Sequence, residues 1–464
     1  MTNRELLIES IMSEMRREVE SFVANITAET DVLDDVENAA REFAQRSGGV
    51  VFEAHIKACL EAQRYGHVGD TVELSGGGTA YFERYEERWV LCHLGRYRIK
   101  RAYYWDPRGR SGAIPLDERW DLDEREPSPS LRKSIGMLSA EIPFARGRKL
   151  MKQMALLDLP EKRLQESGEA LGERIQEQNR VEARAALPML RDPNVGIPEV
   201  LPSARSGTLY IQMDGGRLNT TTEGWREPKV ATLYWGDDVA EVSKDRRVIL
   251  EKEYVAVLGD ADELAERLWA AACRWEWWKA ARVVVLGDGA PWIWNRASDL
   301  FPDATQILDL FHVEEHIWET ARQLYGGAGK QKDKGAAVSK KSTAKDRKTA
   351  AWAKARIAEL KAGDIDAVVR NLARLRPSRE EARESVATLS GYLGENRSRM
   401  NYAKHEADGL TVGSGSIESG IKNVVNQRMK GCGMRWAVDR AESMLNLRAA
   451  YLSDVGPAAE CLAA

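Results

Sequence analysis

Hydrophobic residues in the first part of the chain recur with two different periods. Between residues 6 and 23 they fall three to four positions apart, and a second amphipathic stretch follows, so residues 1–65 are predicted to be helical. From 68 to 105, aromatic and β-branched residues alternate around a glycine run, which predicts a small β-rich module. Spaced leucine, isoleucine and methionine residues then predict further helices between 130 and 192.

From about residue 203, short apolar runs alternate with amphipathic stretches. Five of these runs predict β-strands, and they are TLYIQM (208–213), KVATLYWG (229–236), EYVAVLG (253–259), ARVVVLG (281–287) and TQILDLF (305–311). The stretches that follow the last three runs predict helices at 261–280, from Pro291 and at 312–325. Three strands followed by alternating helices and strands are typical of an α/β fold with a mixed sheet and flanking helices.

A basic segment at residues 326–350 interrupts this pattern and has no apolar periodicity. Residues 329–361 contain eleven lysine and arginine residues against three aspartate and glutamate residues. Such a composition is typical of a solvated linker. It also suits a loop that contacts DNA, in which Lys340 and Lys341 are the candidate contacts.

The rest of the chain returns to a helical pattern. Residues 351–402 have leucine and valine at helical spacing, and two more helices are predicted at about 417–430 and 436–452, after the glycine-rich VGSGS. These changes of pattern divide the chain into six regions. They are 1–65 (helical), 66–125 (β-rich), 126–200 (helical), 203–325 (the sheet and its helices), 326–408 (basic loop and helices) and 409–454 (C-terminal helices).

Composition and charge limit the classes to which this protein can belong. The 464 residues are 43% hydrophobic and 30% charged, which is normal for a globular protein of several domains. No apolar run approaches the roughly 18 residues of a membrane span, and the N-terminus lacks the apolar region of a signal peptide. Five scattered cysteines without a CxxC pair predict a cytoplasmic protein without a disulfide framework. The net charge is −4, so any nucleic acid must be bound by local basic patches.

Two aspartates stand where predicted strands end, and each is followed by glycine. Asp214 ends the strand in YIQMDGG, and Asp288 follows VVVLG. A carboxylate beside glycine leaves room for a hard cation such as Mg²⁺ and for a phosphate group. The two carboxylates converge if the first and fourth strands are neighbours. Each Asp-Gly pair is also a common turn, which is its ordinary structural interpretation.

A third acidic candidate, Glu418, lies at the start of a predicted helix for which Ser416 is a suitable N-cap. Four polar residues spaced four apart form one stripe of that helix. They are Glu418, Lys422, Asn426 and Lys430. An acid, an amide and cations on one helix face suit a metal ion beside a phosphate backbone. A solvated face with ion pairs is the commoner explanation of such a stripe.

The sequence HVEEH forms a competing motif. His312 and His316 match the histidines of the HxxEH zinc-protease pattern, in which Glu315 would be the base. The match covers five residues and has no identified third ligand. The structural alternative is that His312 packs at the sheet edge while His316 lies on a helix.

Taken in order, the motifs resemble those of bacterial DDE transposases of the ISKra type, which are related to the ISLre and Mutator-like groups. The resemblance covers roughly residues 85–452. It rests on RAYYW, PLDERWDL, YIQMDGGR, VVVLGDGAPWIW, ILDLFHVEEHIW, NRSRMNYAKHEADGLTVGSGSIESGIK and RMKGCGMRW. Relatives often carry cysteines after the RAYY segment, whereas this chain has WDPRGRSGAIPLDE, so we expect a version of that element without zinc.

The resemblance implies an RNase H-like catalytic core with a helical insertion between the second aspartate and the glutamate. It implies that Asp214, Asp288 and Glu418 are the catalytic, metal-binding triad, which holds two Mg²⁺ ions per active site, with Mn²⁺ as a substitute. Asp309 and His312 match an element that supports the active site in Mutator-like enzymes.

The resemblance also implies a reaction and its partners. Water would cleave a phosphodiester at the transposon end, and the freed 3′-OH would attack target DNA without a protein nucleophile. Double-stranded DNA is the implied partner, at least a homodimer is expected because two ends must be joined, and region 126–200 would hold a helix-turn-helix. Four cations that follow Glu418 are candidate phosphate contacts, namely Lys422, Arg428, Lys430 and Arg435.

Two other interpretations stay open at this point. A catalytically idle descendant of a transposase would bind DNA in a salt-sensitive way without cutting it. A zinc metalloprotease built on HVEEH would bind about one zinc ion per chain and lose its activity when His312 is replaced.

Overall fold

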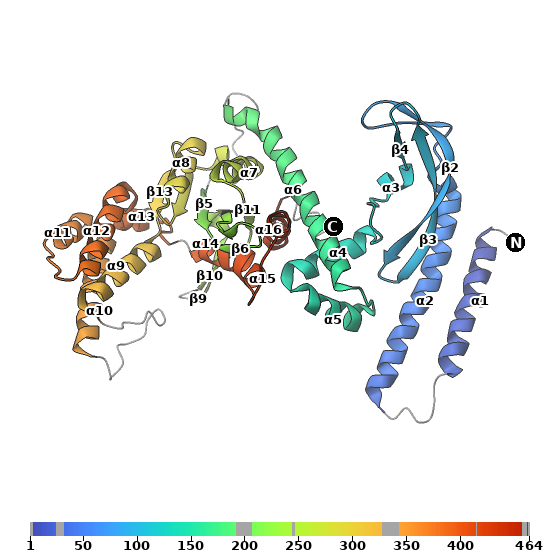
Figure 1. Cartoon of the computed structure of the whole chain (residues 1–464), viewed down its shortest axis with the longest axis horizontal. Helices are drawn as coiled ribbons and strands as arrows, with labels where there is room; N and C mark the ends of the chain where they lie inside the picture. Colours follow the sequence, from blue (N-terminus) through green and yellow to red (C-terminus); the bar gives the residue numbers. More distant parts are fainter. Residues whose placement is uncertain are drawn as a thin grey trace. The chain divides into compact units, whose positions relative to one another are not determined.

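The computed structural model describes residues 3–24, 32–191, 207–243, 246–326, 343–413, 415–456 and 462, and for residues 3, 191, 246, 416 and 418 it describes the backbone alone. The described part of the chain is an α/β structure (Figure 1). It forms two compact units, Met1–Leu171 and Gly172–Ala464, and the boundary between them falls inside one long helix. This division is coarser than the six regions expected from the sequence.

The first unit combines helices with an antiparallel sheet. Its helices are α1 (Asn3–Ala24), α2 (Leu33–Ala62), α3 (Pro115–Arg119), α4 (Pro129–Glu141), α5 (Phe144–Ala155) and the first part of α6 (Glu161–Arg191). Its strands are β1 (Thr71–Glu73), β2 (Thr79–Cys92), β3 (Gly95–Asp106) and β4 (Ser111–Ala113), which pair in that order. The predicted succession of helix, β-rich module and helix is therefore confirmed.

One face of this sheet is covered by α2 and α3, and the core between them is apolar. Leu60 and Leu116 from the two helices pack against Ile99 of β3. Asp117 of α3 forms ion pairs with Arg88 and Arg101, which stand on neighbouring strands. Ion pairs and apolar packing thus hold α3 on the sheet.

The second unit is built on a five-stranded mixed sheet in the order β11-β8-β5-β12-β13. Its strands are β5 (Thr208–Gly215), β8 (Lys229–Trp235), β11 (Glu253–Val257), β12 (Arg282–Gly287) and β13 (Thr305–Leu308). Two small hairpins pair β6 (Leu218–Thr220) with β7 (Gly224–Arg226), and β9 (Val239–Ser243) with β10 (Arg246–Ile249). All five predicted strands are confirmed, and so is the mixed character of the sheet, because β5 is antiparallel to β8 and parallel to β12.

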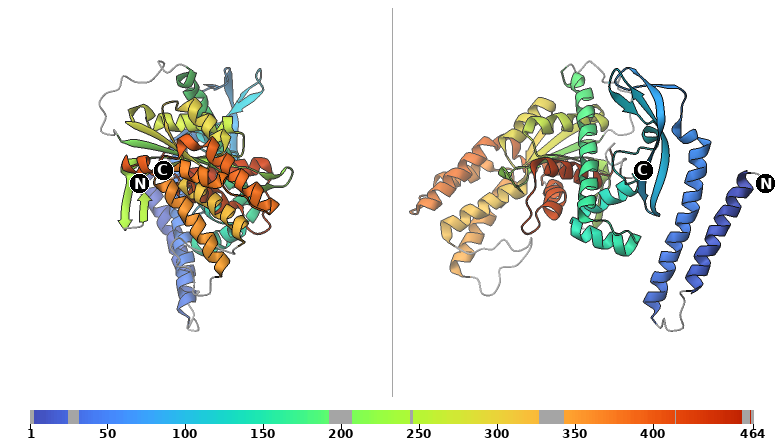
Figure 2. Two further views of the ribbon diagram at one scale, coloured as in Figure 1. Left: turned by 90° about the vertical axis from the view of Figure 1, so that its left-hand side faces the viewer. Right: turned by 45° about the vertical axis from the view of Figure 1, so that its right-hand side comes forward.

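Helices flank this sheet and follow it in the chain. They are α7 (Ala261–Arg274), α8 (Pro291–Leu300), α9 (Leu310–Tyr325), α10 (Ala344–Lys361), α11 (Ile365–Ala373), α12 (Glu380–Glu395), α13 (Tyr402–Ala407), α14 (Gly415–Gly420), α15 (Gln427–Met429) and α16 (Val438–Leu452). The helices from α10 to α13 form a helical insertion, in which α10 and α12 pack against α9 (Figure 2).

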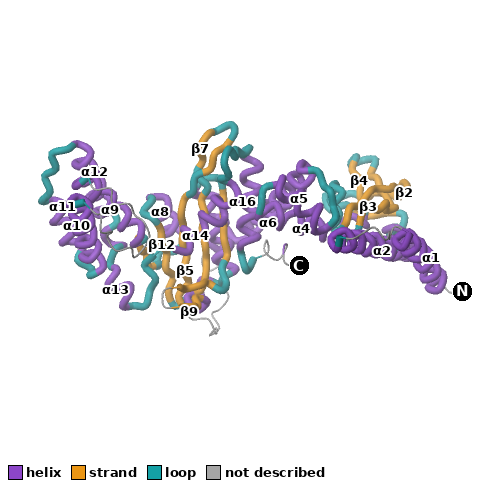
Figure 3. The backbone as a smooth tube through the Cα atoms, turned by 90° about the horizontal axis from the view of Figure 1, so that it is seen from below, coloured by secondary structure: helices purple, strands orange, loops and turns teal. Residues whose placement is uncertain are grey.

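The two faces of the sheet are covered by different helices because side chains alternate along each strand. Leu209, Ile211 and Met213 of β5 belong to the large apolar core that includes α7. Gln212 points to the opposite face, where its Oε1 accepts a hydrogen bond of 3.1 Å from the backbone N–H of Ile417 in α14. Figure 3 shows α14 alongside β5 and α8 alongside β12.

The predicted single helix at 417–430 is corrected by the structure. It consists of α14, a π-helix at Ile421–Asn426 and α15. In a π-helix each backbone hydrogen bond joins residues five positions apart instead of four, so the expected polar stripe with a spacing of four does not run along one continuous face. Lys422 and Lys430 are exposed, whereas Asn426 is half-buried.

Candidate functional site

Asp214 and Asp288 stand side by side at the same edge of the sheet. The parallel register of β5 and β12 pairs Met213 with Gly287, and each aspartate is the next residue along its chain. Neighbouring strands lie about 4.8 Å apart, so the backbones of the two aspartates leave the sheet at that spacing. The first and fourth predicted strands, β5 and β12, are therefore neighbours, which is the condition under which the two carboxylates converge.

Both aspartates are held by local hydrogen bonds. The Oδ1 atom of Asp214 accepts from the backbone N–H of Gly215 at 2.7 Å, and Oδ1 of Asp288 accepts from the N–H of Ala290 at 2.9 Å. Both side chains are half-buried. The carboxylates are thus anchored at the end of the sheet and remain partly accessible, as a metal and substrate site requires.

Asp309 occupies the corresponding position at the end of β13. The register pairs Gly287 with Leu308, and the Asp309 N–H donates to the Gly287 carbonyl oxygen at 2.9 Å. The Asp309 carboxylate accepts from the N–H groups of Phe311 and His312, at 3.1 and 3.3 Å. Asp309 is therefore the buried N-cap of α9, beside the loop that carries Asp288.

The backbone of Glu418 lies in α14 and against the same sheet. Ile417, one residue before it, is hydrogen-bonded to Gln212, two residues before Asp214. Ile421, three residues after it, lies against Gly216, where an added Cβ would meet the isoleucine Cγ2 at 3.5 Å. The chain on either side of Glu418 therefore contacts the chain on either side of Asp214. The Glu418 side chain lies outside the described atoms.

Tyr392 of α12 also reaches this edge of the sheet, which no pattern in the sequence indicated. Its hydroxyl donates a hydrogen bond of 2.7 Å to the carbonyl oxygen of Asp288. Its ring lies 4.5 Å from that of His316, centroid to centroid. Burial, followed by the charges of Asp288 and Asp309, raises the pKa of Tyr392 well above its usual range, so the hydroxyl stays protonated. Burial, with His312 as the second cause, lowers the pKa of His316.

The histidines of the HVEEH motif lie on one face of α9. The ring centroids of His312 and His316 are 5.3 Å apart. Among the side chains that the structure describes, no three histidine, cysteine, aspartate or glutamate residues are grouped closely enough to hold a metal ion. The third ligand that a zinc protease needs is therefore not found beside these histidines in the described ranges.

The predicted phosphate contacts do not all lie on the surface. Lys422, Lys430 and Arg435 are exposed. Arg428 is 1% exposed, its guanidinium lies 5.3 Å from the centre of the Trp436 ring, and burial lowers its pKa to about 10. The expectation that Arg428 contacts DNA is wrong for this structure, because its guanidinium packs inside the protein. Lys340 and Lys341 lie outside the described residues.

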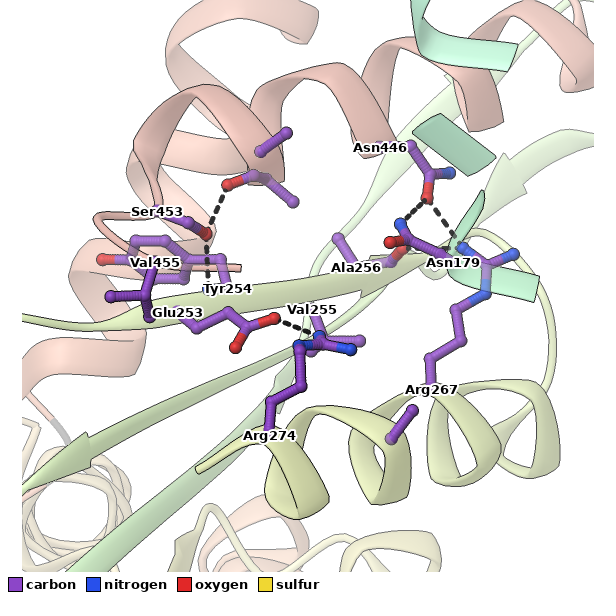
Figure 4. Close-up of a pocket in the computed structure, with 13 residues that line it drawn as sticks. Asn179, Glu253, Tyr254, Val255, Ala256, Arg267, Arg274, Asn446, Ser453 and Val455 are labelled. Atoms are coloured by element: carbon purple, nitrogen blue, oxygen red, sulfur yellow. Dashed lines mark hydrogen bonds and ion pairs between the residues drawn. The ribbon is translucent and has the colours of Figure 1, made fainter. Parts of the chain in front are cut away.

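A separate polar cavity lies between α6, α7, α16 and β11 (Figure 4). Its volume of about 20 Å³ suits a single water molecule and excludes a substrate. Arg267 is hydrogen-bonded there to Asn446 at 2.8 Å and paired with Glu442 at 3.2 Å. These contacts join α16 to α7, so this cavity belongs to the framework of the unit.

The donor chemistry at the sheet edge fits magnesium. Mg²⁺ prefers oxygen ligands and usually takes one or two protein carboxylates together with water and phosphate oxygens. Asp214 and Asp288 offer two carboxylates from adjacent strands, both partly accessible. The backbone of Glu418 lies beside them.

A comparison with models of known protein families finds none that matches this chain, and a comparison with curated proteins finds no match either. The resemblance to DDE transposases therefore stays a prediction. Within the described ranges, every helix is too short or too polar to cross a lipid bilayer.

Proposed function

We propose that this protein is a DDE-type transposase with an RNase H-like core, which cleaves DNA at the ends of an insertion sequence and joins the freed 3′-OH to target DNA. The observation that carries the proposal is the parallel, in-register pairing of β5 and β12, which brings Asp214 and Asp288 together. Further support comes from α14, which carries Glu418 and packs on β5, and from the helical insertion between Asp288 and Glu418.

In this proposal the chain supplies ligands, alignment and charge. Asp214, Asp288 and Glu418 would hold two Mg²⁺ ions, whose chemistry is to stabilise the charge of the scissile phosphate and of the entering and leaving oxygens. Two strands of one sheet fix the aspartates, so their positions need little reorganisation during the reaction. Double-stranded DNA is the substrate, and at least two copies of the chain act together on the two transposon ends.

The function is tested by cleavage of a supercoiled plasmid that carries the DNA flanking this gene, in Mg²⁺ or Mn²⁺ at low salt. Wild-type protein is compared with Asp214→Asn and Glu418→Gln. We expect metal-dependent breaks at the flanks that both variants lose. Equal nicking by all three proteins would indicate a contaminant and reject the catalytic assignment. Retained binding without cleavage by the wild type would support an idle DNA-binding descendant instead.

The exposed cations after Glu418 give a second prediction. If Lys430 contacts one DNA phosphate, Lys430→Ala weakens binding for every sequence alike and lowers the slope of log affinity against log salt by about 0.9. The measurement is fluorescence anisotropy of labelled duplex DNA between 50 and 200 mM salt (roughly the range over which such contacts lose most of their affinity). Arg383→Ala is the matched control, because Arg383 is exposed on α12 in the insertion. A slope unchanged by Lys430→Ala would remove this residue from the DNA interface.

A further inference from the structure

The helical insertion contacts the candidate site through Tyr392. Tyr392 projects from α12, and its hydroxyl donates a hydrogen bond of 2.7 Å to the carbonyl oxygen of Asp288. Its ring lies against the next residue, Gly289, where an added Cβ would stand 2.7 Å from the tyrosine Cε2. Gly289 has a φ of +102°, which other residues rarely adopt. Glycine is therefore required here both by the turn and by the close approach of the ring.

These contacts fix both ends of Asp288. The side-chain Oδ1 accepts from the N–H of Ala290, and the backbone carbonyl accepts from Tyr392. The peptide group between Asp288 and Gly289 is thereby held from one side, and the aspartate side chain is held from the other. Without the tyrosine hydroxyl, the peptide group could rotate, and the carboxylate that depends on the same turn would move with it.

The insertion has other attachments to the sheet, which do not involve this hydroxyl. The Nε of Arg399 donates to Oε1 of Gln306 at 2.8 Å, and its guanidinium lies 4.5 Å from the centre of the Trp294 ring. In addition, α10 and α12 pack along α9. Loss of the Tyr392 hydroxyl alone is therefore expected to leave the insertion in its position.

We propose that Tyr392 is a positioning residue, through which the helical insertion sets the geometry of the second metal-binding aspartate, Asp288. The inference rests on the proposed function, because it gives the insertion a part in shaping that same metal site. It predicts that the Tyr392 hydroxyl keeps the turn at residues 288–290 ordered in the metal-free protein. It also predicts that the same hydroxyl increases the affinity of the site for metal.

The test compares Tyr392→Phe with Tyr402→Phe in the full chain. Tyr402 is also a buried tyrosine of the insertion, and its hydroxyl has no hydrogen-bond partner among the described residues, so its loss is expected to have no effect on the turn. Two properties are measured. Hydrogen exchange of the peptide that covers residues 286–292 reports the turn without metal, and electron paramagnetic resonance of free Mn²⁺ reports metal binding.

We expect Tyr392→Phe to speed exchange in that peptide and to weaken Mn²⁺ binding about three- to tenfold, the usual worth of one hydrogen bond. Tyr402→Phe should match the wild type in both measurements. Unchanged exchange, or faster exchange with unchanged Mn²⁺ affinity, would overturn the positioning role and leave the proposed function intact. Absence of Mn²⁺ binding by the wild type would overturn both proposals, and Asp288→Asn provides the reference for a damaged metal site.

Discussion

Asp288→Asn is expected to reduce DNA cleavage by roughly a thousandfold or more while the protein stays folded. Asparagine keeps the Oδ1 atom that accepts the hydrogen bond from Ala290, so the turn after β12 can form as before. The substitution removes the negative charge, and with it the strong oxygen ligand that Mg²⁺ prefers. The substitution is therefore expected to lower the rate of the chemical step and the affinity for metal, and to leave the fold unchanged. The measurement is the initial rate of plasmid nicking, together with the midpoint of thermal unfolding.

Asp303→Asn is the matched control for this substitution. Asp303 is exposed in the loop that leads into β13, at the opposite edge of the sheet from Asp288. The same chemical change there should leave both the nicking rate and the unfolding midpoint close to those of the wild type. Wild-type cleavage by Asp288→Asn would show that Asp288 is not a metal ligand. A large fall in its unfolding midpoint would attribute the lost activity to unfolding instead.

The strands of the core could be predicted from the sequence, but their order could not. The run that forms β12 has four successive apolar residues, Val283–Leu286, followed by glycine, which is typical of a strand buried on both faces. Its neighbours are chosen by tertiary packing, and no local pattern encodes them. Only the structure shows that β12 lies between β5 and β13. That strand order brings Asp214 and Asp288 next to each other.

The sequence predicts the C-terminal part of the candidate site less well than the strands of the core. Helical spacing correctly predicts helices after the VGSGS segment, yet it cannot reveal the i→i+5 hydrogen bonds of the π-helix at Ile421–Asn426. Arg428 is one of the cations that follow Glu418, so the resemblance implies a DNA contact for it, whereas its guanidinium packs against Trp436 inside the protein. Tyr392 stands 104 residues from Asp288, and only folding brings the two together.

Arg267→Met is expected to have a free energy of unfolding about 3–5 kcal/mol lower than that of the wild type, because the substitution leaves a buried carboxylate without its cation. Arg267 and Glu442 are 4% and 9% exposed and are 3.2 Å apart. Glu442 also accepts from the backbone N–H of Leu258, at the end of β11. The pair therefore joins α7 and α16 to the sheet, and loss of the cation strains the attachment of the C-terminal helices.

The stability that Arg267→Met loses relative to the wild type should depend on pH. Burial already raises the pKa of Glu442, and Arg267 is the main influence that lowers it. Without Arg267, the folded-state pKa rises further above its value in the unfolded chain. For a carboxyl with a raised folded-state pKa, stability is fully present below the unfolded pKa and is lost as pH rises through the folded one. The deficit of Arg267→Met relative to the wild type should accordingly be largest at neutral pH and shrink as pH falls.

Urea unfolding followed by tryptophan fluorescence at about pH 5 and about pH 7.5 measures how the deficit changes with pH. The double variant Arg267→Met with Glu442→Gln should recover part of the loss, because glutamine can still accept from Leu258 and carries no charge to bury. Arg383→Met, in an exposed ion pair with Glu380, should change stability by no more than about 0.5 kcal/mol. A deficit of Arg267→Met that is equally large at both pH values would mean that the substitution acts through lost packing. The buried ion pair would then not be what holds α16 against the five-stranded sheet.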